Sequence, residues 1–422
     1  MSWVSIICLS LCFLIVSTAF TRRADVFAPY RVFGFIWFLA IGLTDLKFSF
    51  YQREWSVYSW FVLFIGVGSA LLGFFIVAVT FLDQPMLSLR EQRKKILERP
   101  VNEEVLFWSI IVLASLYTIG FIAEVLVAGG VPAFAAKPDR ARVDFGFFGM
   151  HLFVTMMPTI LLLATEYFVF VRDGSRKRRK SLVIAAYSFV FLSFALLLVR
   201  FLYVMWGVPT LCFLYYATNR VKLKHFVLSI AGFFGFLQIL RSIRSIGYVE
   251  NYSYVIARVR FPKTYSAFTE PYMYIVMNLE NFARSVEQWT SFTYGYFTLD
   301  FLMALTGLKH PLAKEFGLVE RPFLISSYNT FSFLMPFYQD FGVIGVAVIP
   351  FLIAVTIGYT YHTMRRRPTI ANAMVYSFGV SILVLSFFIH ALGMLSIFLN
   401  LCVLIFVNYR MLPQGQTGRA FE

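Results

Sequence analysis

Long apolar stretches dominate this sequence, and each is about as long as a bilayer is thick. A membrane-spanning helix needs about 20 apolar residues. Eleven segments meet or approach this length: 2–20, 30–46, 57–81, 105–128, 148–171, 181–199, 201–218, 225–240, 341–362, 371–389 and 392–409. Only 14% of the 422 residues are charged, which is too little polar surface for a soluble protein of this size. We expect an all-α polytopic integral membrane protein with about 11 (10–12) transmembrane helices.

The basic residues occur in short runs between the apolar stretches and predict the orientation of the chain. These runs lie at 22–31, 90–99, 172–180, 219–224 and 365–367. Cytoplasmic loops carry an excess of Lys and Arg, so we place the runs inside, with the N-terminus outside and the C-terminus inside. The net charge of +15 is therefore read as orientation signals and contacts with anionic lipids, not as nucleic-acid binding. The first stretch has no positive charge before it, which favours a retained helix over a cleaved signal peptide.

A single charge, Arg200, interrupts the apolar run from 181 to 218. Both ends of this run are predicted to be cytoplasmic, so the run crosses an even number of times. Its length allows two short helices at 1.5 Å per residue. The turn between them is therefore expected close to Arg200, at the outer face.

Other arginines are predicted at the same outer level. Arg140 and Arg142 lie in the loop "GGVPAFAAKPDRARVDFG" (129–146), and Arg241 and Arg244 follow the eighth stretch. As a structural alternative, these arginines extend to lipid headgroups or pair with Asp139, Asp144 or Glu250. Five arginines at three hairpin ends favour a site for an anionic, phosphate-bearing lipid, because the guanidinium fork matches phosphate oxygens.

The segment from 241 to about 328 is the one long hydrophilic region, and we expect it to be a large outer loop with amphipathic helices. Apolar residues recur at helical spacing from Tyr272 to Val286, with Thr269 and Pro271 as a helix start. The opposite face carries Asn278, Asn281, Arg284 and Gln288. This predicts a helix that lies on the outer leaflet or covers a cavity. Glu280 and Arg284 are four residues apart, so a local ion pair is the structural alternative for Glu280.

The stretch "YNTFSFLMPFYQDFGVIGVAVIPFLI" (328–353) places Asp340 at the outer boundary of the ninth span. A kinase interpretation of "DFG" is excluded because the other kinase motifs are missing. Asp340 is expected either to pair with one of the outer arginines or to act in acid–base chemistry. His151 and His390 are expected to be packed, hydrogen-bonded residues. The four cysteines lie in apolar stretches, and no metal-ligand spacing or nucleotide-binding loop occurs.

The quoted motifs resemble a family. "GGVPAF…DRAR", the short hairpin with Arg200, "RSIR" at 241–244 and "YNTF…PFYQDFGVIG" are similar to bacterial oligosaccharide repeat unit polymerases of the O-antigen polymerase (Wzy) type. The likeness covers the layout from about 120 to 360. It implies a multi-pass enzyme of the inner membrane whose site faces the periplasm. Such an enzyme moves a growing glycan from undecaprenyl pyrophosphate to the next lipid-linked repeat unit, without metal or cofactor, beside a flippase and a chain-length regulator.

The resemblance, together with the outer arginines, gives each candidate residue a role. Arg200, Arg241 and Arg244 are assigned to the pyrophosphate, and Arg140 and Arg142 to the second carrier or the donor. The candidates for the proton acceptor are Asp340, Glu270 and Glu280. The candidates for binding the acceptor glycan are Asn329, Tyr338, Asn278 and Arg284. Three regions follow: 1–240 with spans one to eight, 241–328 as the periplasmic loop, and 329–422 with spans nine to eleven and a cytoplasmic tail.

Three alternatives remain. An O-antigen ligase uses a similar donor but a lipid A core acceptor, and would want a histidine beside an arginine in the large loop, where only His310 occurs. A lipid-linked oligosaccharide flippase or other transporter would show internal repeats and charges at mid-membrane. A non-catalytic scaffold would explain the large loop but give the outer arginines no role.

Overall fold

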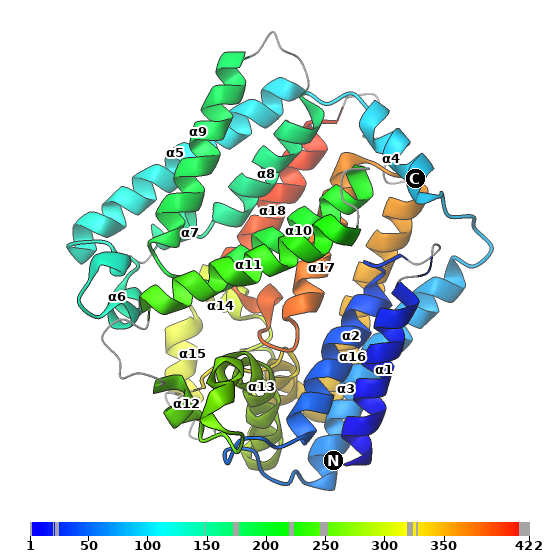
Figure 1. The fold of residues 1–422 in the computed structure, drawn as a ribbon, viewed down its shortest axis with the longest axis vertical. Coiled ribbons are helices and arrows are strands. Elements are labelled where there is room, and N and C mark those ends of the chain that lie inside the picture. The colour runs from blue at the N-terminus through cyan, green and yellow to red at the C-terminus, as the bar shows by residue number, and fades with distance from the viewer. Residues whose placement is uncertain are drawn as a thin grey trace. The chain divides into compact units, whose positions relative to one another are not determined.

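The computed structural model of the chain is built from helices (Figure 1). It describes residues 2–19, 21, 25–147, 149–171, 177–218, 223–244, 252–318, 324–325 and 328–412. Within these ranges the only β pairing is two isolated bridges, Ser49 with Val259 and Ile325 with Tyr328. The predicted all-α class is confirmed for this part of the chain.

Four helical segments in the described part of the chain are long and apolar enough to cross a membrane. They are Val57–Thr80, Glu103–Phe134, His151–Phe170 and Leu334–Arg366. Shorter apolar helices cover Trp3–Ala19, Phe201–Ala217, Ile370–Leu385 and Leu395–Arg410. A helix lies on every one of the apolar stretches predicted from the sequence. Length and composition alone thus support a membrane protein with at least these four candidate spans.

The chain divides into two compact units. Unit 1 comprises Met1–Pro85, Val249–His362 and Ile382–Phe398, and unit 2 comprises Met86–Tyr248, Thr363–Ser381 and Leu399–Glu422. Each unit therefore joins segments that are far apart in the sequence. The packing boundaries cut across the three regions that we drew from hydropathy alone.

Unit 1 contains the N-terminal helices and the long hydrophilic segment. Its helices are α1 (Trp3–Ala19), α2 (Pro29–Asp45), α3 (Val57–Thr80), α12 (Tyr252–Ala257), η3 (Lys263–Phe268), α13 (Thr269–Gln288), α14 (Asp300–Leu305), α15 (Lys309–Glu315), most of α16 (Leu334–Arg366) and η4 (Ala391–Gly393). The start of α18 (Leu395–Arg410) and the end of α17 (Ile370–Leu385) also belong to it.

Small residues allow α3 and α16 to approach closely. A Cβ atom added at Gly73 would lie 2.7 Å from the carbonyl oxygen of Phe351, and one at Gly66 would lie 2.8 Å from Val346. Between apolar helices in lipid there is little hydrophobic driving force, so close van der Waals packing through small residues has to hold the pair together. These glycines are therefore part of the α3–α16 interface.

Helix α16 begins at Leu334, ahead of the predicted start at 341, and is interrupted at Gly342. Gly342 has φ 62° and ψ −146°, which side-chain-bearing residues rarely adopt. The apolar stretch predicted from the sequence therefore corresponds to the regular part of α16 after this kink. The preceding turn carries Asp340.

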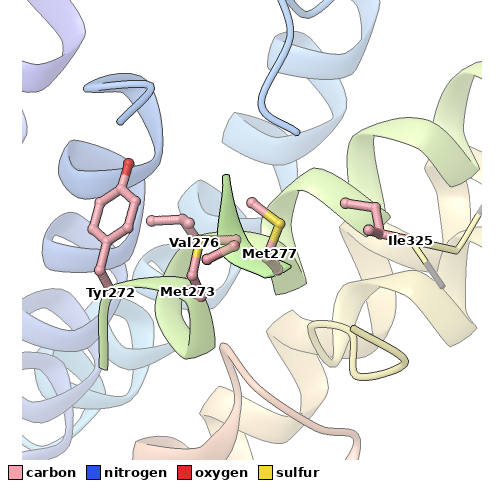
Figure 2. Close-up of a cluster of buried hydrophobic side chains, with 6 residues drawn as sticks. Tyr272, Met273, Val276, Met277 and Ile325 are labelled. Atoms are coloured by element: carbon pink, nitrogen blue, oxygen red, sulfur yellow. The ribbon is translucent and has the colours of Figure 1, made fainter. Parts of the chain in front are cut away.

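Helix α13 begins at Thr269 as predicted, and part of its polar face is buried. Figure 2 shows its apolar side, where Tyr272, Met273, Val276 and Met277 form a cluster with Ile325. On the other side Asn278, Glu280 and Asn281 are fully buried. The predicted helix is thus formed, and unit 1 supplies partners for its buried polar groups from 51–55 and 325–330.

Unit 2 holds the other helices. They are α4 (Leu89–Glu98), α5 (Glu103–Ala128), η1 (Pro132–Phe134), α6 (Pro138–Asp144), α7 (His151–Val154), α8 (Met157–Phe170), α9 (Lys177–Ala195), α10 (Phe201–Ala217) and α11 (Leu223–Arg244), with most of α17 and α18. Helix α8 packs against α5, α9 and α10, and Asn400 of α18 donates to the carbonyl of Thr155 at 2.9 Å.

Candidate functional site

The three predicted hairpin ends with arginines lie together in unit 2. The amide of Ala133 in η1 donates to the carbonyl of Leu196, in the turn between α9 and α10, at 3.0 Å. The following helix, α6, packs against α11, which ends at Arg244 (Figure 1). The loop after α5 is thus joined to both other arginine-bearing segments.

The turn between α9 and α10 falls where the sequence predicted it. Helix α9 ends at Ala195 and α10 begins at Phe201, directly after Arg200. Leu198 adopts a left-handed conformation with φ 60°, which reverses the chain over few residues. Arg200 is half-buried at the start of α10, and Arg241 is half-buried near the end of α11. The side chain of Arg244 and the whole of Glu250 lie outside the described residues.

The two arginines of α6 form ion pairs within that short helix. Arg142 Nη2 lies 3.4 Å from Asp139 Oδ1, and Arg140 Nε lies 4.0 Å from Asp144 Oδ2. These are two of the pairs expected under the structural alternative. The Arg140 side chain is 81% exposed, and a long, exposed pair of this kind contributes little to stability. Arg140 can therefore turn to an anionic ligand at small cost.

Asp340 is buried and holds a loop instead of an arginine. Its Oδ1 accepts from the hydroxyl of Thr293 and from the amide of Phe297 at 3.2 Å, and its Oδ2 accepts from the amide of Thr298 at 2.6 Å. Within the described residues Asp340 forms no ion pair, and its pairing with an outer arginine stays a prediction. Both carboxylate oxygens are occupied by the 293–298 loop.

Glu280 lies at the centre of a second buried network. Its Oε2 accepts from the indole of Trp55 at 2.8 Å, and its Oε1 lies 3.3 Å from Arg284 Nε and 3.5 Å from Arg53 Nε. Arg53 also pairs with Glu287 at 2.6 Å. The i, i+4 pair with Arg284, expected as the structural alternative, is formed.

The pKa of Glu280 reflects two opposing effects. Burial raises it, because a charged carboxylate loses its hydration in the interior. The Trp55 hydrogen bond and the two arginines lower it, but burial dominates and the net pKa is raised. Glu280 is therefore more basic than a solvated glutamate, although donors occupy both of its oxygens.

The other sequence candidates have mixed environments. Glu270 is half-buried at the start of α13, and Asn329 is exposed. Tyr338 is buried and donates its hydroxyl to the carbonyl of Val286 at 3.1 Å. Asn278 is fully buried and donates to the carbonyl of Tyr274 one turn earlier. All the proposed carboxylate and glycan residues belong to unit 1, whereas the five arginines belong to unit 2.

Unit 2 contains an acidic group that the sequence analysis did not select. Glu124, near the end of α5, is 1% exposed. Its Oε1 accepts from the amide of Phe147 at 3.2 Å and lies 2.9 Å from His151 Nδ1. Within the described part of the chain its Oε2 is buried without a hydrogen-bond partner. The available signal was the lone carboxylate inside the apolar stretch 105–128, since such residues are rare in membrane helices.

His390, by contrast, is packed as expected. Its Nε2 lies 3.1 Å from the carbonyl of Thr298, and its ring packs edge-on against Phe337. Among the described residues no group of three or more His, Cys, Asp or Glu side chains could hold a metal ion.

Comparisons of this chain with models of known protein families, with curated proteins and with solved structures find no match.

Proposed function

We propose that this chain polymerises undecaprenyl-pyrophosphate-linked oligosaccharide repeat units at the periplasmic face of a bacterial inner membrane. One observation carries the proposal: three arginine-bearing segments, far apart in the sequence, are joined in unit 2 by the Ala133–Leu196 hydrogen bond and by the packing of α6 on α11. An apolar carrier tail with a pyrophosphate head suits arginines set among apolar helices.

In this reaction the leaving group is a pyrophosphate. Negative charge grows on its bridging oxygen as the bond to the sugar breaks, and fixed cations that meet this charge lower the barrier. Arg200 and Arg241, each half-buried, fit this task because ligand contacts are stronger in a less polar setting. The exposed Arg140 fits a role in capturing the second lipid-linked substrate.

The acceptor sugar also needs a proton acceptor, and the unit 1 carboxylates differ in suitability. Asp340 and Glu280 are enclosed by their own donors. Glu270 is half-buried. The enclosed pair fits a role in shaping unit 1 better than direct contact with a sugar hydroxyl.

The test uses purified protein in lipid vesicles with undecaprenyl-pyrophosphate-linked repeat units. Wild-type protein is expected to release undecaprenyl pyrophosphate and to lengthen the glycan in steps of one repeat unit. Arg200→Lys keeps the charge but loses the bidentate fork, which costs about 1.5–3 kcal/mol, or roughly ten- to hundredfold in rate. Arg366→Lys, at the end of α16, is the matched control and keeps the wild-type rate.

A genetic test separates the alternatives. Deleting the gene for a polymerase leaves single repeat units on the lipid core, whereas losing a ligase or a flippase leaves none. Absence of single-unit product in the deletion strain, together with no elongation in vesicles, would overturn the polymerase assignment.

A further inference from the structure

Glu124 and His151 form a carboxylate–histidine pair in unit 2 that resembles an activated base in its geometry. The carboxylate of Glu124 is fully buried, whereas the His151 side chain is 40% exposed. The amide of Phe147 can only donate, so Oε1 acts as an acceptor at this position. With an ionised carboxylate, His151 Nδ1 must carry the proton that it shares with Glu124.

This arrangement leaves the other ring nitrogen, Nε2, as the acceptor. The edge of the ring near Nδ1 is covered by Gly146, where an added Cβ would lie 3.3 Å from Nδ1. Within the described residues Nε2 has no hydrogen-bond partner, so the exposed part of the side chain includes its basic nitrogen. A buried carboxylate that fixes the tautomer of an accessible histidine is a recurring arrangement in histidine base catalysis.

The pair lies at the end of the loop that carries Arg140 and Arg142. The loop leaves α5 after Glu124, passes through η1 and α6, and returns to Glu124 through the amide of Phe147. His151, the first residue of α7, follows directly. Both anchoring points of the arginine loop therefore contain one member of the pair.

From this geometry we infer that His151 Nε2 accepts the proton of the attacking sugar hydroxyl and that Glu124 positions it. The inference rests on the proposed function. In the step, the O–H bond of the acceptor breaks and its proton moves to Nε2, while the oxygen forms a bond to the anomeric carbon of the donor. The bond from that carbon to the pyrophosphate breaks, and its electron pair stays on undecaprenyl pyrophosphate. The imidazolium, stabilised by the Glu124 carboxylate, then returns its proton to water.

The first variant separates catalysis from structure. His151→Asn can still donate a hydrogen bond to Glu124 but has no basic nitrogen. In the vesicle assay we expect kcat to fall on the order of 10²-fold or more, the contribution of a general base. KM for the lipid-linked donor stays unchanged, since the arginines are intact. His310→Gln, an exposed histidine of α15, is the matched control with wild-type kcat.

The second pair of variants tests the chemistry directly. His151→Ala is expected to lose activity and to recover it in part when imidazole is added, because free imidazole can occupy the space and accept the proton. Glu124→Gln is expected to lower kcat by roughly 10- to 100-fold without changing KM, since its neutral amide no longer stabilises the imidazolium that forms when Nε2 takes the proton.

The outcomes are distinguishable. Wild-type kcat in His151→Asn, or loss of activity in His151→Ala that imidazole does not restore, would overturn the role of His151 and leave the polymerase assignment standing. Failure of the wild-type protein to elongate glycan would overturn both. Loss of kcat at constant KM with imidazole rescue supports the assignment.

Discussion

Two buried glutamates, one in each unit, differ in how completely the fold satisfies them. Glu280 of unit 1 accepts hydrogen bonds on both oxygens, from Trp55 and from Arg284. Glu124 of unit 2 has one occupied oxygen and one without a partner, and it connects to the surface through a half-exposed histidine. A buried polar group whose hydrogen bonds are all made within the protein stabilises the fold. A buried oxygen that still lacks a donor can accept a hydrogen bond from a ligand or bind a proton. Substitutions in unit 1 should therefore change stability first, and those at Glu124 should change turnover first.

The largest effect on stability is expected at Gly342, which supports the loop around Asp340. Gly342→Ala forces a side chain into φ 62° and places its Cβ 2.9 Å from the ring of Phe292. Strain and overpacking together should lower the free energy of unfolding by about 2–4 kcal/mol. Thermal unfolding in detergent measures this. Gly68→Ala in α3, where an added Cβ meets nothing within 4 Å, is the control and should be neutral or stabilising. Equal midpoints for both variants would contradict the strained kink.

Glu280→Gln is expected to destabilise the protein by about 1–3 kcal/mol. The NH2 group of the new amide must face the N–H of either the Trp55 indole or an arginine, and two donors cannot form a hydrogen bond with each other. Glu124→Gln, in contrast, keeps an amide oxygen that can accept from both the Phe147 amide and His151 Nδ1, and it should unfold near the wild-type temperature. The two unfolding midpoints, measured side by side, compare the units directly. If Glu124→Gln lowered the unfolding midpoint more than Glu280→Gln, the Glu124 network would be the more important one for stability, contrary to this prediction.

Asp340→Asn should have a smaller effect, about 1–2 kcal/mol, since one amide hydrogen bond of the 293–298 loop is lost while the others remain. Limited proteolysis of this loop, followed by mass spectrometry, should show faster cleavage between 293 and 298. If Asp340 instead contacts the substrate, the Asn variant would lose activity with an unchanged cleavage rate.

The smallest effect concerns pH. Because burial raises the pKa of Glu280, the folded state binds its proton more tightly than the unfolded state does. Its stabilising contribution is fully present below the ordinary pKa of glutamate and is lost as the pH rises through the higher folded-state pKa. The unfolding midpoint of the wild-type protein minus that of Glu280→Gln should therefore be larger near pH 5 than near pH 8. A difference that grows toward alkaline pH would show that the ion pairs dominate over burial.

The sequence predicted the helices well because their signals are local. Apolar length predicted a helix at every stretch, the lone Arg200 marked the turn before α10, and Thr269 marked the start of α13. The pair Glu280–Arg284 was also predictable, since i, i+4 neighbours share a helix face.

The partners of the buried polar groups were not predictable from local pattern. Trp55 reaches Glu280 across 225 residues, and no periodicity encodes such a contact. Two of the three groups that donate to Asp340 are backbone amides, which every residue except proline carries, so these two partners have no residue-type signature. Amphipathic spacing alone could not show that Asn278 and Asn281 on the polar face of α13 are buried, because their burial depends on contacts with distant segments.

The separation of Trp55 from Glu280 also has a consequence for synthesis. At roughly 5–20 residues per second, a ribosome needs on the order of 10–45 s to make the 225 residues between them. During that interval α1, α2 and α3 have left the ribosome, while Arg53 and Trp55 still lack the carboxylate that they contact in the finished protein. The contacts of Arg53 and Trp55 with Glu280 can therefore form only after the α5–α11 part of unit 2 has been made. The N-terminal part of this protein can thus reach its final structure only after α13, from the second half of the chain, has been synthesised.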